Sequence, residues 1–268
     1  MALNTREQRS LALHHYVAWV NFLWFGPIYI LVLRFVARYR IRNKSALRSK
    51  VNQMMVDSGD RPTIICSNHL TLIDSMVITW AICPVIPSLL NFKRVPWHMP
   101  EFANFAKNFA LKFMCYLGKS IYVKRGGGAK ERRKSMDQIH WLLNNGHTFC
   151  MFPEGGRSRS GRVQTDSATY SVGELIQQHP NAKVLTMYIR GDVQKTWGKW
   201  PKLGSTIEAD IKELTIGEIE PGRKGARDIS IRIIEDLIKL ESEYLAREAA
   251  RSAPQSQQNL GVDYLAKT

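Results

Sequence analysis

The stretch IICSNHLTLID at residues 64–74 decides the fold of this chain. An apolar run that follows Pro62 breaks into a polar Ser-Asn-His turn and resumes as an apolar pattern from Leu72. This order predicts a buried strand, a turn at its carboxyl end and then a helix. Open α/β sheets place their sites at the carboxyl ends of strands, so we expect the turn to carry one.

His69 and Asp74 are the candidate catalytic side chains of this stretch. They are five residues apart, one more than the spacing that stacks two side chains on a helical face. They can still meet if His69 precedes the helix and Asp74 lies in its first turn, where the helix dipole favours a carboxylate. A carboxylate bound to one ring nitrogen fixes the tautomer and leaves the other nitrogen as a base. The spacing alone is weak evidence, because it also fits a turn histidine beside a capping aspartate.

Composition indicates a globular protein with a strong excess of positive charge. The chain has 268 residues, 44% hydrophobic and 23% charged, which fits one large α/β domain with appendages or two small domains. Lys and Arg number 38 against 23 Asp and Glu, a net charge of +15 that suits nucleic acid, an anionic membrane, or acidic substrates and carriers. The cysteines have apolar neighbours and no metal-knuckle spacing, so we expect reduced core thiols in a cytosolic environment. They are Cys66, Cys83, Cys115 and Cys150.

The amino-terminal segment is predicted to contact a membrane. Residues 16–33 read YVAWVNFLWFGPIYILVL, about long enough to span a bilayer. Five basic residues follow between Arg34 and Lys44, and this order is typical of an anchor held at the cytoplasmic, anionic leaflet. Gly26-Pro27 should kink or break a helix, so the anchor is either one span or a broken pair of helices in one leaflet. The alternative is a buried helix of the globular domain.

A second candidate site follows an apolar strand predicted over residues 148–152. That strand runs into PEGGRSRSGR at residues 153–162. Glycines let backbone N–H groups approach a ligand closely, and arginines can clamp a phosphate through two hydrogen bonds. The alternative is a solvated basic loop.

The rest of the chain alternates predicted helices and strands. Helices are expected over 43–60, 72–82, 100–117, 129–144, 169–178 and 224–250, and strands shortly after residue 84 and over 120–123, 184–189 and 206–214. Residues 191–205 mix two tryptophans with three lysines, which suits a membrane interface, base stacking or a plain surface loop. The predicted fold is α/β, with a mixed, mostly parallel sheet flanked by helices and a membrane-associated helical segment at the amino terminus. We expect an anchor at 1–45, a main domain at 46–250 and a flexible tail at 251–268.

Taken together, these blocks resemble the glycerolipid acyltransferases, which act on lysophospholipids such as 1-acylglycerol-3-phosphate. Their N-H-x4-D block matches residues 68–74, and their F-P-E-G-[ST]-R-S block matches residues 152–158. A glycine, an apolar strand and a basic end match residues 118–125, and the resemblance covers about residues 60–190. Gly156 departs from the usual Thr or Ser, and a fourth, proline-containing block is matched only loosely by residues 184–189.

The resemblance implies acyl transfer from a thioester to a hydroxyl, with His69 as general base and Asp74 orienting it. A covalent nucleophile at Cys66 or Ser67 is the less favoured alternative. Arg125 and Arg157 would hold the acceptor's anionic head, and Glu154 would bind an acceptor hydroxyl or fix its loop. The implied substrate-binding residues are Lys93, Arg125, Glu154, Gly155 and Arg157.

The resemblance also implies the partners of the reaction. Acyl-CoA or acyl-carrier protein would be the co-substrate, with no cofactor, no metal and no nucleic acid. The enzyme would work at the cytoplasmic face of the membrane, in an anionic leaflet, and convert 1-acylglycerol-3-phosphate to phosphatidate. Other acceptors remain as alternatives, namely an amino-acid lipid, a different lysolipid or a polyketide-like product. A third possibility is a non-catalytic protein that binds anionic lipid.

Overall fold

A five-stranded sheet forms the centre of the molecule in the computed structural model, which describes residues 3–124, 126–218 and 220–252. The strands are β1 (Arg40–Ile41), β2 (Thr63–Ser67), β3 (Thr148–Met151), β4 (Lys183–Gly191) and β5 (Thr206–Glu213). Their order across the sheet is β1-β5-β4-β2-β3. Three of the four neighbouring pairs are parallel and only β4–β5 is antiparallel, which confirms the predicted mixed, mostly parallel sheet.

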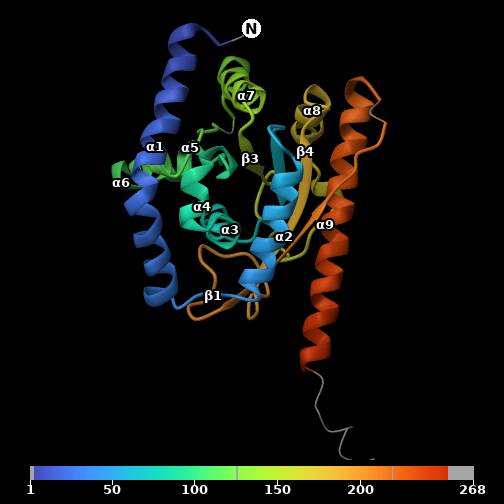
Figure 1. Cartoon of the computed structure of the whole chain (residues 1–268). Coiled ribbons are helices and arrows are strands. Elements are labelled where there is room, and N and C mark those ends of the chain that lie inside the picture. The colour runs from blue at the N-terminus through green and yellow to red at the C-terminus, as the bar shows by residue number, and fades with distance from the viewer. Residues whose placement is uncertain (1–2, 125, 219, 253–268) are drawn as a thin grey trace, which may run out of the picture.

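Helices flank the sheet on both sides (Figure 1). They are α1 (Thr5–Leu31), α2 (Lys44–Asp57), α3 (Asp74–Ile82), α4 (Val85–Leu90), α5 (Phe102–Phe105), α6 (Phe109–Leu117), α7 (Ala129–Asn144), α8 (Tyr170–Gln178) and α9 (Gly222–Ser252). Helices α2 and α3 contribute to one core, and α7, α8 and α9 contribute to the other. This arrangement confirms the α/β class.

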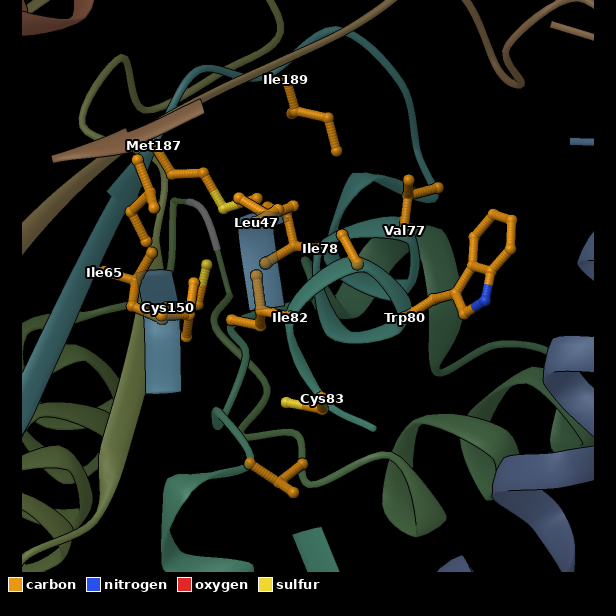
Figure 2. Close-up of a cluster of buried hydrophobic side chains, with 14 of the residues drawn as sticks. Leu47, Ile65, Val77, Ile78, Trp80, Ile82, Cys83, Cys150, Met187 and Ile189 are labelled. Carbon is orange, nitrogen blue, oxygen red and sulfur yellow. The ribbon is translucent and has the colours of Figure 1, made fainter. Parts of the chain in front are cut away.

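Alternating side chains of the central strands divide between these two cores. Ile65 joins Cys150 and Met187 in the core that Figure 2 shows beside α3. Its neighbours Ile64 and Cys66 lie in the opposite core with residues of α7, α8 and α9. Every residue of β2, β3 and β4 is buried, as expected for strands that are covered on both faces.

Helix α1 packs on the domain through one face and leaves another exposed. The buried residues recur every three or four positions and so share a helical face: Leu11, His14, Ala18, Phe22 and Gly26. Trp19 Nε1 donates to the Leu89 carbonyl of α4 at 2.9 Å. The segment Thr5–Val36 is long and apolar enough to cross a membrane, and 22% of its most apolar 18-residue window is buried. A single helix of this kind is a weak sign of membrane association.

Of the two arrangements expected for the anchor, the structure has one continuous helix, and the broken pair of helices at Gly26-Pro27 is wrong. Helix α1 continues through Pro27 to Leu31 and passes into a π-helical turn, Val32–Val36. A proline inside a helix costs about 3 kcal/mol. Contacts on both sides of Pro27 offset that cost, because Phe22 is buried and the Tyr29 hydroxyl donates to the Met76 carbonyl.

The segment after Pro84 was expected to be a strand, but it forms α4. Pro84 is the N-cap of this helix and Pro87 lies in its first turn. Backbone N–H groups of a first turn have no partner within the helix, so proline is tolerated there. The expectation misread these prolines as helix breakers.

The helix predicted over 100–117 is divided into α5 and α6. Asn108 separates them and caps α6, because its side chain accepts the Leu111 N–H at 3.1 Å. Residues 120–123 form isolated bridges with residues 98–101 instead of the predicted strand. The two-residue strand β1 was not predicted, since it is too short to show a pattern. Residues 251 and 252 of the expected tail belong to the last helix, α9. The rest of that tail, residues 253–268, lies outside the described residues.

Candidate active site

The loops that follow β2 and β3 meet at one edge of the sheet. These strands are parallel neighbours, with Cys66 opposite Met151, so their carboxyl ends lie together. The His69 N–H donates to Glu154 Oε1 at 3.0 Å, and the Ser158 N–H donates to the His69 carbonyl at 2.8 Å. The two candidate sites of the sequence are therefore one site.

Asp74 holds the His69 ring in place. Nδ1 of His69 donates to Asp74 Oδ2 at 2.9 Å, so the expected contact forms. The same oxygen accepts the N–H groups of Leu70 at 2.6 Å and Thr71 at 2.8 Å, and the Thr71 hydroxyl donates to Oδ1. Asp74 is 5% exposed and opens α3, where the helix dipole favours its charge. This contact fixes the proton on Nδ1, which leaves Nε2 as the basic nitrogen.

Two neighbours of the pair set the position of the imidazole. The Phe152 ring stacks on the His69 ring with centroids 4.1 Å apart and planes 14° apart. Asn68 pins the turn to β4, because its side chain donates to the Ile189 carbonyl at 3.0 Å and accepts the Ile189 N–H at 2.8 Å. The sequence pattern included Asn68 without assigning it this positioning role.

Glu154 and Gly155 shape the loop after β3. Both carboxylate oxygens of Glu154 are engaged, one by the His69 N–H and the other by the Ser158 hydroxyl. Burial raises the pKa of the Glu154 carboxyl. Gly155 has a φ of +65°, and a Cβ there would lie 2.4 Å from Thr169 Cγ2. The loop thus requires glycine for two reasons, and Glu154 joins this loop to the turn that carries His69.

A third loop, between β4 and β5, closes over the site. The Arg157 guanidinium lies 4.6 Å from the centre of the Trp197 ring and donates to the Gly198 carbonyl at 3.2 Å. The Gly198 N–H in turn donates to the Leu70 carbonyl at 2.9 Å. Sequence analysis singled out the tryptophans of this loop but did not predict that the loop lies beside Arg157. That position depends on the pairing of β4 with β5.

A largely apolar cavity of about 690 Å³ extends from His69, which is within the usual size range of ligand pockets. His69, Gly155 and Arg157 line it together. Its apolar lining comes mostly from helices and includes Phe22, Tyr29, Leu33, Met76, Leu111 and Met114. The site therefore joins a basic imidazole and a guanidinium to a space suited to a long apolar ligand.

Comparison with known families decides the chemistry. Residues 38–190, more than half of the chain, match the Acyltransferase family model. The chain belongs to the acyltransferase family. The matched region contains both loops of the site and confirms the resemblance drawn from the motifs. In the search of curated proteins, none matched this chain.

Membership makes the protein an O-acyltransferase-type enzyme. One expected substrate-binding residue of this acyltransferase, Lys93, lies away from the assembled site. Lys93 is exposed in the turn Phe92–Arg94 and lines a separate cavity of about 390 Å³. Thr63 and Thr148 line the same cavity, which places it at the amino-terminal ends of β2 and β3, opposite His69. Arg125 lies outside the described residues. Spacing along the sequence gives no information about which end of the sheet a loop residue reaches.

The two possible covalent nucleophiles of this acyltransferase are buried. Cys66 and Ser67 are both 0% exposed, and burial raises the pKa of the Cys66 thiol to about 12. Both properties disfavour nucleophilic attack, since the thiolate is the reactive form.

Across the part of the chain that the structure describes, no three His, Cys, Asp or Glu side chains gather in a metal-binding group.

Proposed function

We propose that this protein transfers a fatty acyl group from acyl-CoA or acyl-carrier protein to the hydroxyl of a lysophospholipid. The leading acceptor is 1-acylglycerol-3-phosphate, which would give phosphatidate. The observation that carries the proposal is the His69–Asp74 contact, formed beside an apolar cavity that Arg157 also lines. Family membership supports the acyl transfer itself.

In this mechanism His69 acts as general base. Nε2 removes the proton of the acceptor hydroxyl as its oxygen attacks the thioester carbonyl, and Asp74 stabilises the imidazolium that results. The tetrahedral intermediate collapses with cleavage of the C–S bond, and the imidazolium returns the proton to the leaving thiolate. General-base catalysis of this kind contributes about 10²- to 10⁴-fold in rate. No cofactor and no metal enter the proposed reaction.

The oxyanion of the intermediate needs a preorganised N–H donor. The N–H groups of Leu70 and Thr71 are engaged by Asp74, and that of Gly155 donates to the Phe152 carbonyl. We therefore propose the N–H of Gly156, the next residue of the loop and part of the cavity lining, as the donor.

Arg157 is the proposed binding group for the acceptor phosphate. Trp197 and Gly198 restrain its guanidinium, which has five N–H donors and so retains several for an anion. Arg125 is proposed as a second cation for the same head group. Glu154 and Gly155 would act indirectly, by holding the loop. A role for Lys93 in substrate binding stays a prediction separate from this head-group site.

The net charge of +15 supports the proposed partners. It would hold the enzyme on the anionic cytoplasmic leaflet that contains the acceptor, and attract an acidic carrier protein or the phosphates of coenzyme A. Nucleic acid has no role in this proposal. A second candidate function is the same transfer to another acceptor, and Gly156 favours it because the loop lacks the usual hydroxyl at that position.

The proposal is tested by radiolabelled acyl transfer in membranes that contain the protein. Acyl-CoA and acyl-carrier protein are offered as donors, with lysophosphatidate and a panel of other lysolipids as acceptors. We expect label in phosphatidate with the wild type and none with His69→Ala. Label in a different product would select the second candidate. Absence of any His69-dependent product would refute catalysis and favour a lipid-binding protein.

Arg157→Ala is expected to raise the apparent KM for the acceptor, or to lower kcat with it, because a phosphate contact is lost. Arg159→Ala is the matched control, since Arg159 is an exposed arginine two residues away. Acceptor titrations of the two variants provide the measurement. Equal acceptor dependence in both variants would remove Arg157 from the head-group site.

A further inference from the structure

Helix α6 exposes an apolar surface that a protein in water would normally bury. Phe109 is 83% exposed and Phe113 is 51% exposed, and Leu117 is the buried residue of α6. The other large apolar side chains exposed in this region are Phe102, Leu111, Met114 and Tyr116. A helix that is apolar on most sides requires an apolar neighbour, and exposed patches of this kind mark membrane or protein contacts.

The exposed surface of α6 continues onto α1. His14 of α1 donates through Nε2 to the Tyr116 carbonyl at 2.6 Å, and the two rings stack 4.0 Å apart. Figure 1 shows α6 beside α1, at the edge of the molecule away from α9. The outer side of α1 is also apolar and exposes Leu13, Tyr16, Val20, Leu23, Trp24 and Ile28. The two helices thus present one continuous apolar surface, which we name the α1–α6 surface.

The cavity of the active site opens onto the α1–α6 surface. Large apolar residues that both line the cavity and are exposed mark the apolar part of its rim: Ile28, Val32, Leu111, Met114 and Trp200. They come from α1, the turn that follows it, α6 and the loop between β4 and β5. An acyl chain could move between this rim and a surrounding lipid phase without crossing water, which would avoid the cost of hydrating its methylenes.

The α1–α6 surface could be covered by a lipid bilayer or by a second copy of the chain, and basic residues favour the bilayer. Exposed cations lie within a few residues, along the sequence, of the apolar side chains of α1, of α6 and of Trp200 at the cavity rim, namely Arg34, Arg38, Lys107, Lys112, Lys199 and Lys202. Cations around an apolar surface bind anionic lipid head groups. If a second copy of the chain packed against this surface through its own α1–α6 surface, the cations of the two copies would face and repel one another. Charge complementarity therefore favours an anionic leaflet.

We propose, resting on the membrane location in the proposed function, that α6 is a second membrane-inserted element. Together with the outer side of α1 it enters one anionic leaflet, and the rim of the cavity lies within the lipid. The amino-terminal helix is then one part of a broader docking surface that surrounds the entrance to the active site.

The test measures lipid contact at α6 in the full chain. A Cys115→Ser background removes the one native cysteine that is not buried, and Phe109→Cys is then labelled with an environment-sensitive fluorophore. Val56→Cys is the matched control, because Val56 is an apolar residue of α2 that is 53% exposed. Both proteins are reconstituted into phosphatidylcholine–phosphatidylglycerol vesicles with and without a nitroxide on the lipid acyl chains. Phe113→Cys provides a second position should Phe109→Cys fail to fold.

We expect the nitroxide lipid to quench most of the fluorescence at position 109 and little at position 56. An unquenched label at 109 in protein that floats with the vesicles would overturn the proposal. A spectral change at 109 that depends on protein concentration and not on lipid would assign the surface to a second copy, and overturns it equally. Acyl transfer is assayed separately on the same samples, so quenching at 109 without any transfer would refute the proposed function and leave the docking surface standing.

Discussion

Asp74 accepts hydrogen bonds from the His69 ring, from two backbone N–H groups and from the Thr71 hydroxyl. An ionised carboxylate has about four acceptor positions, so this group is nearly saturated. The N-H-x4-D spacing was interpreted either as a catalytic pair or as a turn histidine beside a capping aspartate, and both interpretations describe this one arrangement. The same carboxylate caps the turn at the start of α3 and orients the imidazole, and its position is fixed before substrate binds.

Asp74→Asn is expected to lower kcat by roughly 10⁴-fold, the fall seen when the equivalent carboxylate of a Ser-His-Asp site is replaced by asparagine. The amide removes the charge that stabilises the imidazolium, and its NH₂ group opposes donors instead of accepting from them. The measurement is kcat in the acyl-transfer assay, with circular dichroism as the test of folding. Asp57→Asn, at an exposed aspartate of α2, is the control. A fall of less than tenfold in folded Asp74→Asn protein would contradict the role of Asp74.

Among the helices and strands, the sequence predicted those elements whose formation depends on their own pattern of apolar and polar residues. The apolar run of β2 and the amphipathic pattern of α7 were predicted from sequence, and α7 spans the predicted residues 129–144. The expectations were wrong at Pro27, where packing on α3 outweighs the proline penalty, and at Pro84 and Pro87, whose positions at the N-cap and in the first turn of α4 tolerate proline. The contact of Arg157 with Trp197 could not be predicted from local sequence, because the pairing of β4 with β5 brings the two residues together.

The close crossing of α8 and α9 at Gly173 leads to a second prediction. A Cβ at Gly173 would lie 1.7 Å from the Ala226 carbonyl oxygen, and the Gly173 N–H donates to Ser230 Oγ at 3.0 Å. Gly173→Ala must therefore separate the helices, and we expect a loss of roughly 2–3 kcal/mol in the free energy of unfolding. Denaturant unfolding in detergent measures it.

Gly128→Ala is the matched control for this crossing. Gly128 is the N-cap of α7, has a φ of −60°, and a Cβ there meets nothing within 4 Å. We expect it to cost less than about 1 kcal/mol. Similar losses from the two substitutions would show that the α8–α9 crossing tolerates a methyl group and that glycine is not required there.

The whole molecule keeps several uncharged imidazoles in its interior, next to a buried lysine. His98 is 5% exposed and His147 is 4% exposed. Burial, reinforced by the positive charge of Lys119, lowers the pKa of His98 to about 3 and that of His147 to about 2. His147 contacts α1, since the His15 ring lies 4.6 Å from the His147 ring between centroids, and His98 lines the active-site cavity together with Phe22 and Tyr29 of α1. Protonation there would place positive charges between α1 and the domain.

These histidines make stability depend on pH in a definite direction. Their pKa values in the unfolded chain are near 6.5, above the folded values, so the unfolded chain binds more protons between pH 6.5 and the folded pKa. Their contribution is fully present above pH 6.5 and is lost as the pH falls. Between pH 7 and pH 5, His98 alone should remove about 2 kcal/mol from the free energy of unfolding.

His98→Gln tests this linkage, because glutamine does not titrate and retains an amide donor for the Thr79 hydroxyl oxygen that His98 Nε2 contacts at 3.0 Å. The variant is expected to be less stable than wild type at pH 7, since the buried ring is lost. The informative quantity is therefore the difference in unfolding free energy between pH 7 and pH 5, measured by denaturant titration for each protein. We expect this difference to shrink in His98→Gln by about 2 kcal/mol. An unchanged difference would mean that His98 has the same pKa in the folded and unfolded chains, and would assign the acid sensitivity to other groups.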